Sequence, residues 1–185
     1  MGLRIIGGSL RGRKLFVARG AVTRPTANRS REAIFNILYT RVRGSAALDL
    51  FAGSGAMGIE ALSRGAEHAV FLDNNRDVCS ALKKNIISCG VEPESAVIQC
   101  DALKKLDFIK RIRPCFNIVF IDPPYNSGLI QPALKNLVKW ELLEKKSDII
   151  VEHSASEALP KGMASFIIAD QRKYGKSRVT FLQYC

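Results

Sequence analysis

The chain of 185 residues has no apolar run long enough to cross a bilayer, and its first residues lack the regions of a secretory signal. These two absences predict a soluble cytoplasmic protein with no membrane partner. Its five cysteines form no Cys-x-x-Cys pair, and no histidine lies at ligand spacing from them. We therefore expect reduced thiols and no metal site.

Acidic residues are almost missing from the first 44 positions, where ten basic residues accompany a single acid, Glu32. This part of the chain holds +9 of the total charge of +11, and residues 45–185 hold only +2. A solvated basic face is the simplest interpretation of such a cluster. Because most of these cations are arginines, the pattern favours phosphate contacts and predicts a nucleic-acid partner.

Internal repeats and low-complexity segments are also missing, so the length predicts one domain with a small appendage. Residues 3–18 indicate a Gly-punctuated hairpin, followed by a helix over about 27–42 with Thr26 as its N-cap. From residue 46 strands and helices alternate, which is typical of a parallel α/β sheet. We predict an extension over 1–44 and an α/β domain over 45–185. The expected strands are 46–51, 68–73, 96–100, 116–121 and 148–153, the helices 56–65, 75–89, 102–112 and 129–140, and a final antiparallel pair 164–169 and 179–184 joined by residues 170–178.

The junction after the first of these strands is rich in glycine, with Gly53, Gly55 and Gly58 in a GxGxxG pattern. Glycines here let a ligand approach the backbone at the N-terminus of a helix. The second strand ends at Asp73, where a carboxylate can accept hydrogen bonds from both ribose hydroxyls. These features fit NAD and S-adenosylmethionine equally well, and a surface acid or helix cap is the alternative for Asp73.

Four aspartates lie inside, at the end of or just after successive strands, and they favour S-adenosylmethionine. Asp49 lies just before the glycines, Asp101 follows the third strand and Asp122 follows the fourth. Acids beside the loop suit a cofactor with a sulfonium and an ammonium group, and they would repel a pyrophosphate. Ligands of open α/β sheets gather at these strand ends, so we expect the four carboxylates to share one edge.

The segment Asp122-Pro123-Pro124-Tyr125 follows an apolar strand. Both prolines fix φ and lack an N–H, so the backbone forms a rigid corner there. A plain strand-ending turn is one interpretation. The alternative, which the position beside the other acids favours, is a corner that holds a flipped base while its amine is methylated.

Seven motifs occur in order along nearly the whole chain, and together they resemble the bacterial 16S rRNA (guanine-N2)-methyltransferases that modify guanine 966. Asp-Pro-Pro-Tyr alone marks amino-methyltransferases broadly, whereas the N-terminal motifs narrow the resemblance; Asn117, where the family often has Asp, is a departure. The motifs are residues 5–8, 11–13, 24–26, 31–38, 49–55, 60–66 and 122–125.

The resemblance implies a class I methyltransferase fold, Rossmann-like, with a seven-stranded sheet and one antiparallel strand at its edge. It implies S-adenosyl-L-methionine as cofactor and 16S rRNA as substrate, presented in the small ribosomal subunit, with a monomeric enzyme. The expected acceptor-site residues are Asp122, Pro123 and Tyr125; the expected cofactor residues are Asp49, Phe51, Gly53, Gly55, Asp73, Asn74, Asp101, Ala102, Arg24 and Thr26; the expected RNA-binding residues are Arg11, Arg13, Lys14 and Arg24.

Three other functions remain compatible with parts of the sequence. A DNA adenine-N6 methyltransferase would use the same corner, although no stretch is long enough for a separate target-recognition domain. An NAD oxidoreductase would leave the corner unexplained. A non-catalytic RNA-binding or ribosome-assembly protein would leave the acids and glycines unexplained.

Overall fold

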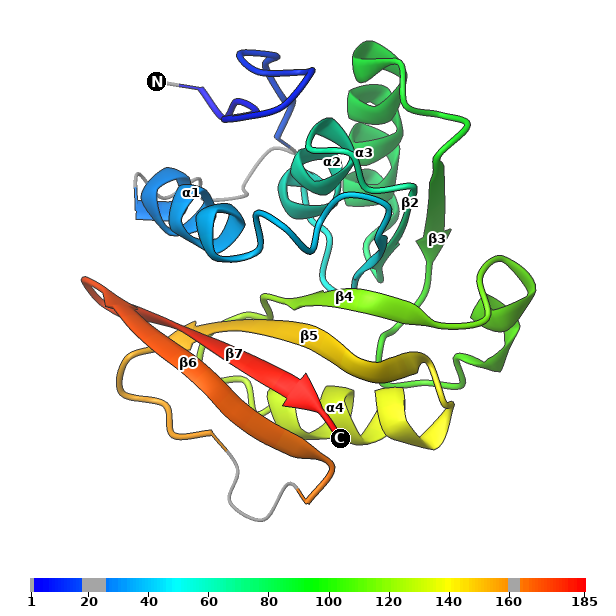
Figure 1. The fold of residues 1–185 in the computed structure, drawn as a ribbon. Coiled ribbons are helices and arrows are strands. Elements are labelled where there is room, and N and C mark those ends of the chain that lie inside the picture. The colour runs from blue at the N-terminus through cyan, green and yellow to red at the C-terminus, as the bar shows by residue number, and fades with distance from the viewer. Residues whose placement is uncertain (1, 18–25, 160–163) are drawn as a thin grey trace.

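The computed structural model describes residues 2–17, 26–159 and 164–185. Within them, seven strands form one sheet in the order β3-β2-β1-β4-β5-β7-β6 (Figure 1). The first five strands in this order are parallel, and β7 is antiparallel to both of its neighbours. The predicted α/β class is thus confirmed, but the antiparallel strand lies one place in from the edge. The strands are β1 (Ala46–Asp49), β2 (His68–Asp73), β3 (Ser95–Gln99), β4 (Phe116–Ile121), β5 (Leu143–Ser154), β6 (Phe166–Tyr174) and β7 (Ser177–Tyr184).

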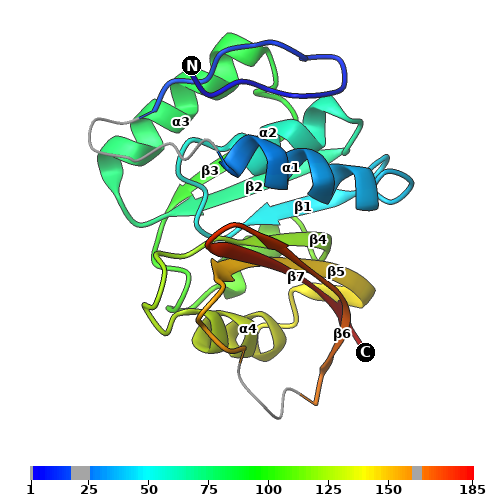
Figure 2. The same cartoon turned by 90° about the vertical axis from the view of Figure 1, so that its left-hand side faces the viewer.

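Helices cover both faces of the sheet (Figures 1 and 2). Successive strand residues point to opposite sides, so an apolar strand presents apolar side chains to both layers of helices. Ala47 belongs to the core under α1, α2 and α3, whereas its neighbour Leu48 belongs to the core under α4. Both side chains are fully buried, which explains why the strand is apolar on both faces. The helices are α1 (Thr26–Ile37), α2 (Ala56–Ser63), α3 (Arg76–Cys89), α4 (Ile130–Lys139) and the short 3-10 helix η1 (Asp107–Arg111).

The predicted helix over 102–112 is wrong. Residues 101–106 are a turn with irregular flanks, and only η1 is helical there. Asp101 Oδ1 accepts the backbone N–H of Leu103 at 2.9 Å, an Asx-type turn that competes with helix formation. The apolar residues of this stretch are spaced as in a helix, but they belong to turns that pack under the sheet.

The end of the chain forms a longer hairpin than predicted. Strands β6 and β7 extend through most of the polar residues assigned to a loop, and Gly175 with φ of +59° lies in the short turn between them. The predicted antiparallel direction is confirmed. The second half of β6 can be polar because all nine residues of the strand are exposed or half-buried, as expected at a sheet edge.

The basic extension packs onto the domain that follows it. α1 ends at Ile37, earlier than predicted, and its Ile34 and Phe35 enter the same core as Phe120 of β4. The two arms of the hairpin expected over 3–18 pair through backbone bonds such as Leu15 N–H to Leu3 O at 2.9 Å. Only Arg4 with Lys14 forms a regular antiparallel bridge, so neither arm is a strand, and residue 18 lies outside the described residues. The division at residues 44 and 45 stays a prediction, and the shared core joins the two sides of it. None of the helices in the described ranges is long and apolar enough to cross a membrane.

Candidate cofactor and acceptor site

The four predicted aspartates follow adjacent strands at one edge of the sheet. The observed strand order places them in the sequence Asp101, Asp73, Asp49 and Asp122, at the carboxyl ends of β3, β2, β1 and β4. The two central acids interact, since the charge of Asp73 raises the pKa of Asp49. The structure therefore brings these four positions together, as the strand pattern predicts.

The glycine loop between β1 and α2 is shaped by close packing. Gly55 caps α2 in the left-handed conformation, with φ of 77°, and a Cβ there would lie 2.2 Å from the Leu82 side chain. A Cβ on Gly58 would lie 2.2 Å from the Phe71 ring. Larger residues would thus push α2 away from β2 and α3. The loop keeps its backbone at the sheet edge, where the absence of side chains on its glycines lets a ligand approach.

Asp49 is the buried member of the four aspartates at this edge. It is 3% exposed, and burial raises its pKa to about 7, helped by the charge of Asp73 and opposed by hydrogen bonds from the backbone of Gly58 and Phe51. Its Oδ2 is buried and has no hydrogen-bond partner among the described residues. A buried carboxylate with an unused oxygen fits a ligand that carries positive charge, such as the ammonium group of S-adenosyl-L-methionine.

Asp73 joins the glycine loop to the start of α3. Its Oδ2 accepts the N–H of Gly53 at 3.0 Å, and its Oδ1 accepts the N–H of Asn75 at 2.9 Å. Asn75, and not Asp73, caps α3, because its side chain accepts the N–H groups of the first turn. The helix-cap interpretation of Asp73 is therefore wrong. Each oxygen retains a lone pair that can accept a ribose hydroxyl.

The loop after β3 is fixed from α4. The buried amide of Asn136 donates to the carbonyl oxygens of Ala102 and Lys104 at 2.8 and 2.7 Å, and accepts the indole N–H of Trp140 at 2.9 Å. These bonds hold Asp101 and Ala102 at the sheet edge. The predicted Asn74 and Phe51 flank the same edge, exposed and half-buried respectively.

The Asp-Pro-Pro-Tyr corner directly follows β4. Asp122 is exposed, Pro123 is buried and Tyr125 is half-buried. The Tyr125 hydroxyl donates to Oε1 of Glu152, near the end of β5, at 3.1 Å. This bond joins the aromatic ring to the neighbouring strand, so the ring has a defined orientation beside Asp122. Sequence reasoning missed Glu152, because its partner lies 27 positions away.

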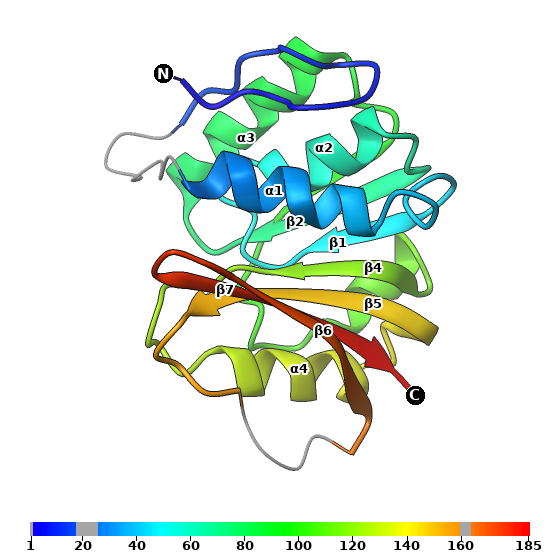
Figure 3. The same cartoon turned by 60° about the vertical axis from the view of Figure 1, so that its left-hand side comes forward.

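The basic N-terminal segment, residues 2–17, lies across α2 and α3 (Figures 2 and 3). Arg11, Arg13 and Lys14 are exposed, and none of the ion pairs in the described ranges involves them. Together with Arg4 they line a groove on the outer surface. The predicted Arg24 lies outside the described residues, and Thr26 is the first residue of α1, with its side chain outside the description.

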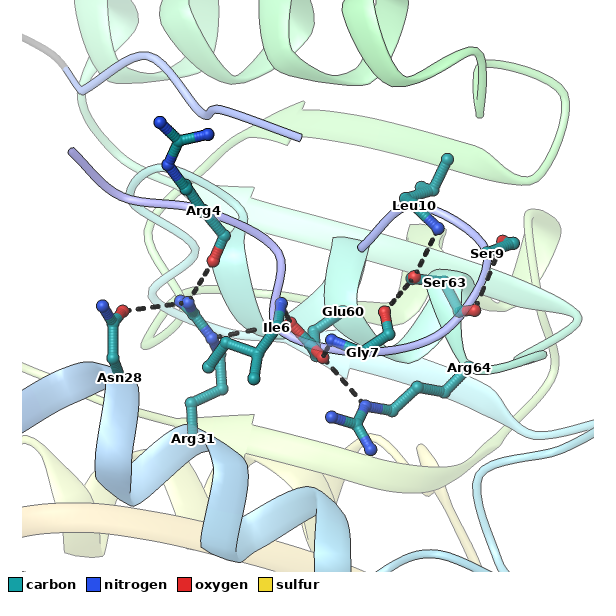
Figure 4. Close-up of polar contacts among 10 residues, drawn as sticks. All are labelled: Arg4, Ile6, Gly7, Ser9, Leu10, Asn28, Arg31, Glu60, Ser63 and Arg64. Carbon is teal, nitrogen blue, oxygen red and sulfur yellow. Dashed lines mark hydrogen bonds and ion pairs between the residues drawn. The ribbon is translucent and has the colours of Figure 1, made fainter. Parts of the chain in front are cut away.

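A fully buried glutamate on α2 holds this segment in place. Glu60 accepts the N–H groups of Ile6 and Gly7 at 2.8 and 2.7 Å, and it pairs with Arg64 at 2.8 Å and Arg31 at 3.7 Å (Figure 4). Burial lowers the pKa of Arg31, which the charge of Glu60 opposes. One buried carboxylate thus joins the N-terminal segment to α1 and α2.

Further contacts explain the glycine at position 8 and fix the end of the segment. Gly8 has φ of +74°, and a Cβ there would lie 1.8 Å from the carbonyl oxygen of Ser63. At the other end, the fully buried Asn85 accepts the N–H of Phe16 at 2.6 Å and donates to its carbonyl at 2.8 Å. Asn85 also donates to the carbonyl of Ser54 at 2.9 Å, so it ties the basic segment to the glycine loop.

Solved structures that share this fold include S-adenosyl-L-methionine-dependent methyltransferases. The chain therefore has the Rossmann-like fold of this class, with the glycine loop and the carboxylates together at one edge of its sheet.

The chain matches the family described as Conserved hypothetical protein 95 over residues 3–183, and it belongs to that family. It is 38% identical to the ribosomal RNA small subunit methyltransferase D of Haemophilus influenzae, over 85% of this chain and 81% of that protein. It is 34% identical to a candidate rRNA methyltransferase of Bacillus subtilis, over 96% of both chains. A solved structure of a candidate methyltransferase from Escherichia coli has a TM-score of 0.83 and 33% identity, and covers 100% of this chain and 98% of its own. The resemblance found in the sequence and S-adenosyl-L-methionine as cofactor are thereby confirmed.

Proposed function

We propose that this enzyme transfers a methyl group from S-adenosyl-L-methionine to the exocyclic N2 amine of a guanine in 16S rRNA, within the small ribosomal subunit or an assembly intermediate of it. The observation that carries the proposal is the Asp-Pro-Pro-Tyr corner at the end of β4, next to the glycine loop of β1. The relatives' names support rRNA of the small subunit as substrate. An enzyme with this substrate works in the cytoplasm, and we expect it to act as a monomer.

The cofactor roles follow the order of the acids along the sheet. Asp49 and the backbone of Gly53 and Gly55 hold the methionine end, Asp73 the ribose and Asp101 the adenine, with Ala102 beside the ring. Phe51, Asn74, Arg24 and Thr26 complete the proposed contacts. When bound, S-adenosyl-L-methionine supplies an electrophilic methyl group on a sulfonium. Asp49, ionised by the neighbouring positive charge, fixes the distance of that end of the cofactor from the corner.

The corner orients the acceptor. The guanine N2 amine is a poor nucleophile because its lone pair is delocalised into the ring. Asp122 and the carbonyl of Pro123 accept its two N–H groups, turn the lone pair toward the methyl group, and stabilise the positive charge that develops on nitrogen. Tyr125 stacks on the extruded base, and the bond of its hydroxyl to Glu152 fixes the ring plane for this contact.

The basic N-terminal segment supplies the grip on RNA phosphates. Arg11, Arg13 and Lys14 are exposed and carry no ion pair within the described ranges, so phosphate contacts cost them no existing partner. Because Glu60 and Asn85 fix this segment to α2, α3 and the glycine loop, RNA bound there has a defined position relative to the corner.

Labelled S-adenosyl-L-methionine tests the substrate class against its rivals. We expect methyl incorporation into small ribosomal subunits, none into DNA, and N2-methylguanine as the labelled base after hydrolysis. Incorporation into DNA as N6-methyladenine would establish the adenine-N6 alternative. Cofactor binding without transfer to DNA, naked rRNA or subunits would favour a non-catalytic RNA-binding protein.

A further inference from the structure

The pairing of β4 with β5 places a second carboxylate beside the acceptor corner. Ile121, the last residue of β4, is in parallel register with Val151 of β5. The next residues along the two strands are Asp122 and Glu152. Since neighbouring strands lie about 4.8 Å apart, these two positions are adjacent at the sheet edge.

Glu152 lies on the face of the sheet that carries the cofactor loop. Ile150 belongs to the core under α1, α2 and α3, as Ala47 does, while Val151 belongs to the core on the other face. Because the strand has a period of two residues, Glu152 is on the side of Ile150, and Asp49 is on the side of Ala47. Glu152 and Asp49 thus flank Asp122 in the strand order, on one face.

The Glu152 carboxylate is hydrogen-bonded to Tyr125 of the corner. Its Oε1 accepts the tyrosine hydroxyl at 3.1 Å, and the side chain is only half-buried. A carboxylate can accept about four hydrogen bonds, so the bond to Tyr125 does not by itself prevent it from accepting another from a base that stacks on that ring. The ring and the acid therefore form one unit beside the corner.

Two carboxylates side by side match one base edge better than another. The Watson–Crick edge of guanine presents two neighbouring donors, the N2 amine and N1–H. Adenine presents one amine beside an N1 that accepts, and a carboxylate facing that nitrogen would oppose two lone pairs. If Asp122 accepts the amine, the neighbouring carboxylate of Glu152 is the acceptor next to it for the second donor of that edge, N1–H.

We propose that Glu152 is a specificity-determining residue, which accepts N1–H of the extruded guanine and thereby excludes adenine. This inference rests on the proposed function and answers the question that the Asp-Pro-Pro-Tyr corner leaves open, because that corner suits either amine. Recognition of an extruded base through its Watson–Crick edge is the general means by which base-modifying enzymes select their target.

The test uses 2-aminopurine, which keeps the amine at C2 but has an accepting N1 in place of N1–H. Small subunits are assembled from 16S rRNA that carries guanine or 2-aminopurine at the position methylated by the wild-type enzyme, and single-turnover rates of methyl transfer are compared. We expect the wild type to prefer guanine by at least ~100-fold, as sites built to bond a substrate N–H do. Because its amide can donate to N1, Glu152→Gln should slow transfer to guanine, accelerate transfer to 2-aminopurine, and reduce the ratio at least ~10-fold.

Tyr125→Phe is the matched control, since it removes the bond to Glu152 but keeps the ring. Tyr125→Phe should retain the preference for guanine. If Glu152 merely held the tyrosine, Glu152→Gln and Tyr125→Phe would change the rate ratio equally. The inference is overturned if the guanine to 2-aminopurine rate ratio is unchanged in Glu152→Gln, or if it changes equally in Tyr125→Phe. In either case, methylation of guanine by the wild type leaves the proposed function intact. If the wild type methylates no guanine in rRNA, the proposed function fails and this inference fails with it.

Discussion

Replacing Asp122 by Asn should lower the single-turnover rate of methyl transfer by at least ~100-fold, the loss typical when one preorganised group that stabilises transition-state charge is removed. The asparagine amide keeps one accepting oxygen but has no negative charge, so it stabilises the positive charge that develops on nitrogen far less than a carboxylate does. The affinity for S-adenosyl-L-methionine should stay within a few-fold of the wild type, because the glycine loop and the other three aspartates are untouched. Rapid-quench kinetics with saturating small subunits and calorimetry of cofactor binding measure the two quantities.

Asp170→Asn provides the control for removal of a surface carboxylate. Asp170 lies on β6 and pairs with Arg172 at 2.8 Å, remote in the strand order from the corner. Its variant should transfer at the wild-type rate. A normal rate in Asp122→Asn would remove the acid from the reaction, and a parallel loss of cofactor affinity would assign it to cofactor binding instead.

Asp49→Asn should have opposite effects on cofactor affinity and on stability. The variant loses a charge-assisted contact to the cationic end of the cofactor, of about 1.5–3 kcal/mol, so its dissociation constant should rise roughly 10- to 100-fold. In the wild type the pKa of the free Asp49 is about 7. Cofactor affinity should therefore fall by up to tenfold per pH unit below pH 7 and level off above it. In the variant this pH dependence should disappear, as calorimetry across pH 6 to 8 would show.

The stability effect has a definite sign. The pKa of Asp49 is raised from 3.8 to about 7, so the folded state binds more protons than the unfolded state between these values. The wild type therefore loses stability as pH rises through this window, by up to about 4 kcal/mol. Free of cofactor, Asp49→Asn should be more stable than the wild type at pH 8 and close to it at pH 4. Urea unfolding at both pH values checks this.

An exposed aspartate serves as the matched control for both measurements. Asp107 lies on η1 and pairs with Lys105 at 2.9 Å, a contact that lowers its pKa. Asp107→Asn should leave cofactor affinity unchanged and should not stabilise the protein at pH 8. If Asp49→Asn binds the cofactor as the wild type does, Asp49 is a structural acid and the assignment of the methionine end is wrong.

The strand-end acids could be predicted because each one directly follows an apolar run. β2 and β4 begin and end where the sequence predicts, and both end next to a predicted site residue. Local patterns failed where polar residues bond to the backbone or face solvent. Asp101 turns the chain where a helix was expected, and the polar residues 170–174 at the end of β6 show no apolar alternation, so the sequence predicts a loop there.

The residues that hold the site together could not be found from spacing. Glu60 binds backbone groups 54 and 53 positions away, Asn85 binds Phe16 at 69 positions, and Glu152 meets Tyr125 at 27. A lone Glu or Asn on a predicted helix is usually a solvated residue, and only the packing shows that Glu60 and Asn85 are fully buried. These contacts depend on which elements become neighbours in the fold.

The central claim is methylation of a guanine N2 in 16S rRNA, and the most direct test maps that modification in cells with and without the gene. Small-subunit rRNA from the two strains is digested, and N2-methylguanosine is located and quantified by mass spectrometry. We expect one N2-methylguanosine to disappear in the deletion strain, to return with the wild-type gene, and to stay absent with the Asp122→Asn gene. An unchanged set of N2-methylguanosines in the deletion strain would contradict the proposed function.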